Sequence, residues 1–390
     1  MDRQKLPRVV LAIHFILLMA FCSVSVLNLF PLFLESLGAN ARQIGFLVGL
    51  FSVSAFLSRP LSGWLLSRLN PKKVLIGGAL LMLIMTCLYY IVTDLGWLII
   101  CIRIGHGLGF AVFYLAALFI TIRAVEERSR TYAIGFVSTG FVLPLLVIPY
   151  MAEVIIQKFG FFHFFSVSVF FAIIPVGVSL FVKVPFKRFS LPEHNAGRGF
   201  FQYFRQRRIR IVFGLTVLFE IGMSATLSFV PLLVHEGSVM RAGFYYTFLG
   251  LTIVFMRLVG GRYFPWWGNP RALLPSFFFL SGGTACLYLS EGNIVLALSG
   301  VVCGIGIGIL YPHLAAIAVA GISQEEQGMV LSLYASSVDL GFALGPLLFG
   351  WISLALGVRV SFIPMAALLM LSSLVLILLN RGILLGHLED

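Results

Sequence analysis

The chain is a succession of long apolar runs separated by short polar connections. A run of roughly 20 residues is long enough, as a helix, to cross the hydrocarbon core of a bilayer. Twelve such runs lie at 9–33, 43–66, 73–93, 97–121, 132–156, 161–183, 209–233, 242–264, 271–290, 293–320, 327–354 and 358–380. They are apolar throughout instead of alternating with polar residues, which favours helices over barrel strands. The sequence therefore predicts an all-α membrane protein with twelve transmembrane helices.

Composition agrees with a membrane location, because 60% of the residues are hydrophobic and only 11% are charged. A chain of this kind would expose too much apolar surface to stay dissolved in water. The first run follows Arg3, Lys5 and Arg8 and has no cleavage site of small residues. We therefore expect it to remain in the mature protein as a helix and not to be a signal peptide.

The positions of the cations predict the orientation in the membrane. Of the 27 Lys and Arg residues, all but five lie at the N-terminus, in or next to alternate connections, or at the C-terminus; the exceptions are Arg42, Arg103, Lys158, Arg241 and Arg359. Cations are retained on the cytoplasmic side, so we expect both termini there. The net charge of +12 is then a topology signal, and nucleic-acid binding is not expected.

The two halves of the sequence match each other in order and at a nearly constant offset. The matched pairs are Pro31 with Pro231, Arg59 with Arg257, Gly63 with Gly261, Glu126–Glu127 with Glu325–Glu326, and GFVLP at 140–144 with GFALGP at 341–346. A parallel six-plus-six repeat is typical of transporters whose halves rock about a central site. We expect an N-terminal six-helix bundle at 1–183, a basic cytoplasmic linker at 184–208 and a C-terminal bundle at 209–390.

The connection between the second and third runs resembles the signature of the major facilitator superfamily, Gly-x-Leu-Ala-Asp-Arg-x-Gly-Arg-Lys. The residues in matching places are Gly63, Leu65, Arg68, Lys72 and Lys73. RIGHG at 103–107 is similar to the family pattern Arg-x-x-Gln-Gly, and Gly345–Pro346 is similar to its motif in helix 11. The resemblance covers nearly the whole chain and implies a twelve-helix transporter that works by alternating access.

The same resemblance implies that this connection is a cytoplasmic latch between the halves, close to the start of helix 11. The predicted latch residues are Arg59, Gly63, Ser67, Arg68, Lys72, Lys73, Glu126, Glu127, Gly341, Gly345 and Pro346. Gly63 would permit a close helix approach, and Arg68 or Lys72 would pair with Glu126 or Glu127. Because Ser67 stands where the family has aspartate, the closed latch is expected to be weaker. The alternative is that these cations only set the topology.

Ionisable groups deep inside apolar runs are costly and usually mark an ion or substrate path. Glu220 lies 11 residues after Ile209, which is about 16 Å along a helix and near the middle of the membrane. Asp339 lies at a similar depth in the eleventh run, and Arg103 and His106 lie in the fourth. The competing interpretations are a structural ion pair for Glu220 or Arg103, a helix seam for Asp339 and an ordinary hydrogen bond for His106. Weaker candidates are the polar groups on helices that line the cavity in the family, namely Asn28, Tyr114, Tyr311 and His313.

With so few fixed charges and so many aromatic residues, the expected cargo is a small lipophilic or amphipathic organic solute. We expect proton-coupled efflux, in which protonation of Glu220 or Asp339 exchanges with cargo and Arg103 favours their charged form. The alternatives are uptake or facilitated diffusion of an amphipathic organic acid attracted to Arg103, and a membrane receptor or scaffold that transports nothing.

Other functional classes find no support in the motifs. The sequence has no HExxH, no GxSxG and no P-loop, so neither an enzyme nor a directly ATP-driven pump is expected. Its five cysteines lack metal-ligand spacing. We expect a monomer in the bacterial inner membrane that uses the proton gradient and no cofactor.

Overall fold

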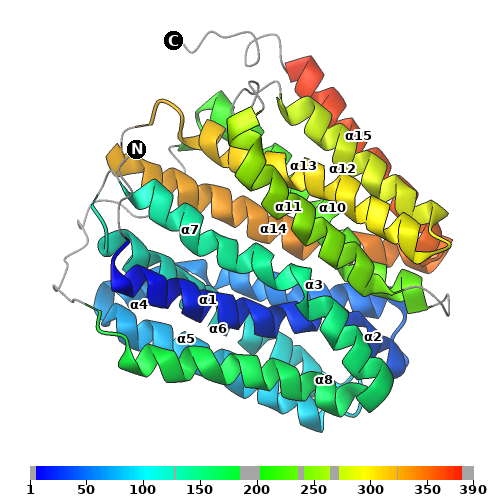
Figure 1. Ribbon diagram of the computed structural model, residues 1–390, viewed down its shortest axis with the longest axis horizontal. Helices are drawn as coiled ribbons and strands as arrows, with labels where there is room; N and C mark the ends of the chain where they lie inside the picture. Colours follow the sequence, from blue (N-terminus) through cyan, green and yellow to red (C-terminus); the bar gives the residue numbers. More distant parts are fainter. Residues whose placement is uncertain are drawn as a thin grey trace. The chain divides into compact units, whose positions relative to one another are not determined.

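The computed structural model describes residues 6–126, 129–184, 203–235, 241–263, 272–322 and 324–379. Within these ranges the chain forms helices and no strand, as the apolar runs predict (Figure 1). The chain divides into two compact units. The first unit consists of Met1–Gly38 and Leu50–Pro192, and the second consists of Ala39–Gly49 and Glu193–Asp390. Residues 185–202 of the predicted linker lie outside the described residues.

The first unit contains helices that are often broken. They are α1 (Arg8–Val26), α2 (Phe30–Ser36), the second part of α3 (Ala41–Leu57), α4 (Arg59–Arg68), α5 (Pro71–Leu88), α6 (Trp97–Arg123), α7 (Arg130–Val142) and α8 (Ile148–Phe181). A bend of 41° separates α3 from α4, where Pro60 occupies the first turn. Within α8 the helix is interrupted at Gly160, whose φ of 76° suits glycine.

The second unit is built from helices that are longer and less interrupted. They are α10 (Arg207–His235), α11 (Ala242–Tyr263), α12 (Leu273–Cys286), α13 (Asn293–Val319), α14 (Gln324–Leu356) and α15 (Val358–Leu379). In Figure 1, α10 to α13 and α15 run side by side, and α10 packs against both α14 and α15. The carboxylate-bearing helices α10 and α14 are therefore direct neighbours.

The described residues contain nine helical segments long and apolar enough to cross a membrane, or ten if the bent α3–α4 pair is one crossing. One of the nine, Tyr132–Phe181, holds both the fifth and sixth predicted runs, and Gly160 breaks it between them. The ninth run falls on Leu273–Leu289, a shorter apolar helix. The all-helical membrane fold is thus confirmed, while the number of twelve crossings stays a prediction.

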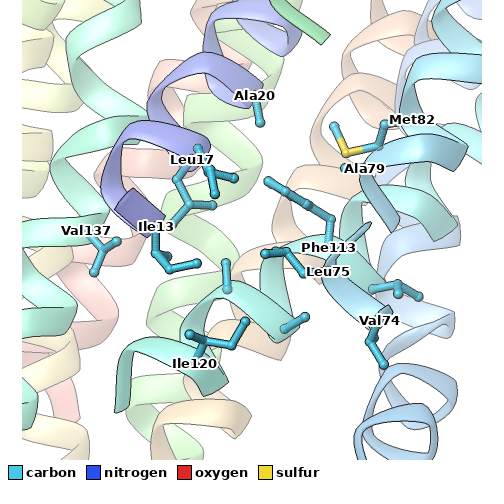
Figure 2. Close-up of a cluster of buried hydrophobic side chains, with 14 of the residues drawn as sticks. Ile13, Leu17, Ala20, Val74, Leu75, Ala79, Met82, Phe113, Ile120 and Val137 are labelled. Atoms are coloured by element: carbon cyan, nitrogen blue, oxygen red, sulfur yellow. The ribbon is translucent and has the colours of Figure 1, made fainter. Parts of the chain in front are cut away.

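The core of the first unit is a cluster of aliphatic and aromatic side chains. Figure 2 shows residues from four helices pointing toward one another: Ile13, Leu17 and Ala20 on α1, Val74, Leu75, Ala79 and Met82 on α5, Phe113 and Ile120 on α6, and Val137 on α7. Between α5 and α6, Gly78 lies so close to Phe113 that an added Cβ would approach its nitrogen to 2.5 Å. This packing fixes α6, the helix that carries Arg103.

Candidate functional site

In the first unit, Arg103 is buried on α6 and is surrounded by aromatic rings. Its guanidinium Nη1 donates a hydrogen bond to the Tyr89 hydroxyl at 3.4 Å. The guanidinium carbon lies 5.0 Å from the ring centre of Phe30 and 5.1 Å from that of Phe51. Aromatic faces attract cations, and the attraction strengthens away from water. These contacts stabilise a positive charge whose side chain is only 5% exposed.

Gly107 explains why Arg103 and Phe51 lie together. A Cβ on Gly107 would overlap the carbonyl oxygen of Phe51 on α3. One turn earlier on α6, the Ile104 carbonyl accepts a hydrogen bond from Ser54 Oγ of α3 at 2.6 Å. The glycine of the RIGHG segment therefore allows α6 to approach α3 closely, and this approach holds Arg103 beside the Phe51 ring.

His106 is completely buried in the same aromatic surroundings. Its ring meets Phe51 edge-on, with 5.3 Å between ring centres. Neither ring nitrogen has a hydrogen-bond partner among the described residues. A buried polar group left unsatisfied costs about 1–3 kcal/mol. The interpretation of His106 as an ordinary hydrogen-bonded histidine is therefore not supported by the described contacts.

Glu153 and Tyr89 are two residues of this unit that the sequence argument missed. Glu153 on α8 is only 5% exposed and lies near the end of the fifth predicted run. The rule that selected Glu220, an acid inside an apolar run, applies equally to Glu153. Tyr89 gave no such signal, because aromatic residues are frequent along the whole chain and nothing in the sequence places this one next to Arg103.

Asn28 and Tyr114 have local partners in the first unit. Asn28 Nδ2 lies 3.5 Å from Ser25 Oγ, at the limit of a hydrogen bond. The ring of Tyr114 stacks on Phe110, with 5.7 Å between ring centres. Their predicted roles in binding cargo stay predictions.

In the second unit, Glu220 is buried on α10 with an exposed fraction of only 1%. Its Oε2 has no hydrogen-bond partner among the described residues. The nearby carboxyl group of Asp339, on α14, is close enough to interact with it electrostatically. A carboxylate buried in this way is costly unless it gains a proton or a cation. The pair therefore has the properties expected of a site that takes up and releases positive charge.

Two glycines of α14 bring the carboxyl groups together. A Cβ on Gly341 would overlap the Cβ of Glu220, and a Cβ on Gly345 would overlap Ser224 Oγ and the Ile221 carbonyl oxygen. Ser224 Oγ also donates a hydrogen bond to the Gly341 carbonyl at 3.2 Å. Small residues four positions apart allow two helix backbones to approach closely. This seam places Asp339 next to α10, and the latch role of both glycines stays a prediction.

Tyr311 packs against Tyr334, a ring that lies near Glu220. Its backbone carbonyl accepts a hydrogen bond from the Tyr334 hydroxyl at 2.9 Å, and the two ring centres lie 5.6 Å apart. The guanidinium carbon of Arg257, on α11, lies 5.9 Å from the Tyr311 ring centre. His313, two residues along α13, contacts the Ile309 carbonyl through Nδ1 at 2.8 Å. From the sequence, Arg257 was expected only as the repeat partner of Arg59, and Tyr334 was not expected at all.

The predicted latch segment has local partners in the first unit. Lys72 Nζ donates a hydrogen bond to the Leu180 carbonyl at 2.8 Å, so among the described residues it binds the end of α8. Ser67 Oγ donates to the Trp64 carbonyl at 2.7 Å. A Cβ on Gly63 would meet no atom within 4 Å, so the close approach expected at this glycine is not seen in the described residues.

The other predicted latch residues occupy various positions. Arg68 and Lys73 are exposed, Arg59 is half-buried at the start of α4, and Glu127 lies outside the described residues. Pro346 lies inside α14, where its carbonyl oxygen would overlap a Cβ on Gly45. Their predicted action as a latch stays a prediction.

Comparison with known proteins agrees with this architecture. A sequence profile described as Major Facilitator Superfamily matches residues 13–319 and 280–383. The chain is 24% identical to the staphylopine export protein of Staphylococcus aureus over 367 residues, which cover 90% of each chain. It is 25% identical to the multidrug resistance efflux pump PmrA of Streptococcus pneumoniae over 334 residues, covering 81% of this chain and 82% of the pump.

Solved structures give the same fold with little sequence identity. The nucleoside transporter NupG superposes with a TM-score of 0.78 and 13% identity, over 96% of this chain and 100% of that one. The human organic anion transporter MFSD10 superposes with a TM-score of 0.70 and 17% identity, over 95% and 99% of the two chains. Such likeness supports the fold and leaves the cargo open.

Proposed function

The chain belongs to the Major Facilitator Superfamily, and on this premise we propose that it exports a small amphipathic organic solute in exchange for protons. Membership makes it a transporter and not an enzyme. The observation that carries the proposal is the state of Glu220, a buried carboxyl group that lies beside Asp339 and whose Oε2 has no hydrogen-bond partner among the described residues. A proton neutralises such a group at the smallest structural cost.

The proposed cycle follows from electrostatics. Two carboxyl groups close together in a dry environment favour at most one negative charge, so the pair holds a proton. When the site opens to water, the proton leaves and the anion is solvated. The site would then bind cargo in one state and a proton in the other. Protons that enter down their gradient would thereby drive the solute outward. No cofactor takes part in this scheme.

Export is favoured over import by the relatives. The S. aureus protein is named for staphylopine export and the S. pneumoniae protein for multidrug efflux. For the cargo we propose an amphipathic compound, because the few charged groups of the spans are accompanied by many rings, whereas a sugar would need many polar contacts. We further propose a monomer in a bacterial inner membrane with both termini in the cytoplasm, as the distribution of cations predicts.

The test measures accumulation of a panel of amphipathic dyes, ethidium among them, in cells that express the wild type or Glu220→Gln. The matched control is Glu291→Gln, which makes the same change at an exposed residue. We expect the wild type and the control to lower accumulation of at least one dye. Glu220→Gln and a protonophore should each abolish the effect at equal protein levels. An unchanged effect in both cases would contradict the proposal.

A second candidate function is uptake or facilitated diffusion of an amphipathic organic acid. It is favoured by the buried Arg103 with its aromatic neighbours Phe30 and Phe51, and by the unsatisfied ring of His106. In this case expression should raise the accumulation of an aromatic carboxylate such as benzoate. Arg103→Gln should abolish the increase, and a protonophore should not change it.

A further inference from the structure

Tyr334 lies near two groups of opposite charge in the second unit. It is buried on α14 and is close enough to interact electrostatically with both Glu220 and Arg257. Glu220 and Arg257 show no direct interaction with each other among the described residues. The phenol therefore connects a carboxyl group near the middle of α10 with a cation on α11.

The contacts around Tyr334 fix its orientation. Its hydroxyl donates to the backbone carbonyl of Tyr311 at 2.9 Å, and the two rings meet edge to face at an interplanar angle of 71°. The Arg257 guanidinium lies over the Tyr311 ring at 5.9 Å, the outer limit of a cation–π contact. Residues of three helices, Arg257 on α11, Tyr311 on α13 and Tyr334 on α14, thus form one group of contacts.

We propose that Arg257 is a positioning residue for the proton on Glu220 and that it acts through Tyr334. The inference rests on the proposed function, in which the Glu220 proton is exchanged. When the proton leaves for water, a carboxylate remains in the protein. The positive charge of Arg257 stabilises that carboxylate, while the anchored Tyr334 ring prevents the two groups from closing into a permanent ion pair. The nearby cation therefore makes proton release easier, and the absence of a direct ion pair among the described residues allows Glu220 to take up a proton again.

Other titratable groups near α10 also act on Glu220. On α14 the nearest is Asp339, whose negative charge opposes the loss of the proton. On α13, which also packs on α10, the groups are Tyr311 and His313; α15 carries Arg359 in its first turn. From α11, the Tyr246 hydroxyl donates to the Leu227 carbonyl of α10. Arg257 is the described cation of this set that interacts with Tyr334.

The test is an infrared titration of the purified full-length protein in lipid nanodiscs. The carboxyl C=O band that is present in the wild type and missing in Glu220→Gln reports the proton on Glu220. Across low-dielectric protein a unit charge changes such an equilibrium by about tenfold, or about one pH unit. We therefore expect Arg257→Gln to raise the midpoint of this band by about one pH unit, because the anion loses its stabilising cation, and Arg257→Lys to restore it.

Two tyrosine variants separate this role from general packing. Tyr334→Phe removes the hydroxyl that anchors the ring, so Arg257 can approach Glu220 more closely; the midpoint should move down, opposite to Arg257→Gln, and by a smaller amount. Tyr246→Phe removes an equally buried hydroxyl that also donates to a backbone carbonyl, and it should leave the midpoint unchanged. If Arg257→Gln fails to fold, Arg257→Lys and the two tyrosine variants decide the question.

The proposal is wrong if the midpoint is unchanged in Arg257→Gln and Tyr334→Phe, or if Tyr246→Phe shifts it as much as Tyr334→Phe does. The titration needs no cargo, so its result is separate from that of the accumulation test. Loss of proton-driven export with a normal Arg257 effect would contradict the proposed function alone. Proton-driven export with no Arg257 effect would contradict this inference alone.

Discussion

The two units bury charge in different ways. In the first unit a cation, Arg103, is surrounded by rings and donates to Tyr89. In the second unit a carboxyl group, Glu220, lies against a glycine seam, and its Oε2 lacks a hydrogen-bond partner among the described residues. The first unit therefore holds its buried cation with several contacts, whereas the second holds a buried carboxyl group with one unsatisfied oxygen among the described residues. Unsatisfied buried groups cost stability and persist mainly where they have a function. His106 in the first unit is also unsatisfied among the described residues, but Glu220 lies beside a second carboxyl group, Asp339, which is why we place the exchanging proton in the second unit.

The repeat itself also diverges in local structure. Arg59 begins α4 directly after the bend that separates it from α3, whereas its sequence partner Arg257 lies within the continuous helix α11 beside Tyr311. Equivalent positions in the sequence thus have different surroundings. A function assigned to one copy does not transfer to the other without its contacts.

The largest expected effect concerns the glycine seam that positions the carboxyl pair. Gly345→Leu places a side chain where even a Cβ overlaps Ser224 Oγ and the Ile221 carbonyl. We expect a loss of about 3 kcal/mol or a failure to fold, because α14 must move away from α10. Thermal unfolding in detergent measures this. The control is Gly214→Ala on α10, where an added Cβ would meet no atom within 4 Å, so it should not lower the unfolding temperature. An unfolding temperature of Gly345→Leu equal to that of the wild type would contradict the close packing of α14 on α10.

The next prediction contrasts the two charges directly. Arg103→Met should lower the free energy of unfolding by about 2 kcal/mol, because it removes a hydrogen bond and two cation–π contacts. Glu220→Met should change it by less than about 1 kcal/mol or stabilise the protein, because it removes a buried carboxyl group whose Oε2 has no partner among the described residues. Unfolding of both variants by denaturant checks the contrast. Equal losses of unfolding free energy in the two variants would contradict the view that the two units hold their buried groups differently.

A smaller effect is expected at His106. His106→Phe keeps an aromatic ring beside Phe51 and loses no hydrogen bond among the described residues. Its free energy of unfolding should stay within about 1 kcal/mol of the wild type. If transport is lost while stability is kept, His106 has a functional role. A loss of stability as large as that of Arg103→Met would show instead that the imidazole makes a structural hydrogen bond.

Sequence reasoning could predict the helices and the buried ionisable groups but not their neighbours. The length and hydropathy of the runs set the helices, and Pro60 marks a bend that proline explains. The depth of Glu220 and Asp339 could be counted along their helices. That they meet depends on how α10 and α14 are rotated, which the sequence does not specify. For the same reason Tyr89 and Phe51 beside Arg103, and Tyr334 beside Glu220, were not predictable, whereas Glu153 was predictable and was overlooked.

The smallest effect on stability is expected at Ser67. Its side chain is exposed and donates only to the Trp64 carbonyl, so Ser67→Asp should change stability by less than about 0.5 kcal/mol. The resemblance to the family predicts that the new carboxylate strengthens the latch and favours the state closed at the cytoplasm. Accessibility labelling of cysteines introduced at the helix ends predicted to be cytoplasmic should decrease, compared with Ser67→Asn. Equal labelling of the two variants would remove support for the latch.

The central claim is that Glu220 exchanges a proton for cargo. In everted membrane vesicles, respiration pumps protons inward, and the acidic interior is measured by the quenching of an acridine dye. Adding ethidium, or another dye whose accumulation the protein lowers, should release protons and dequench the signal in vesicles that contain the wild type or Glu291→Gln. Vesicles with Glu220→Gln should give no dequenching. Equal dequenching with Glu220→Gln at the same protein level would contradict the account.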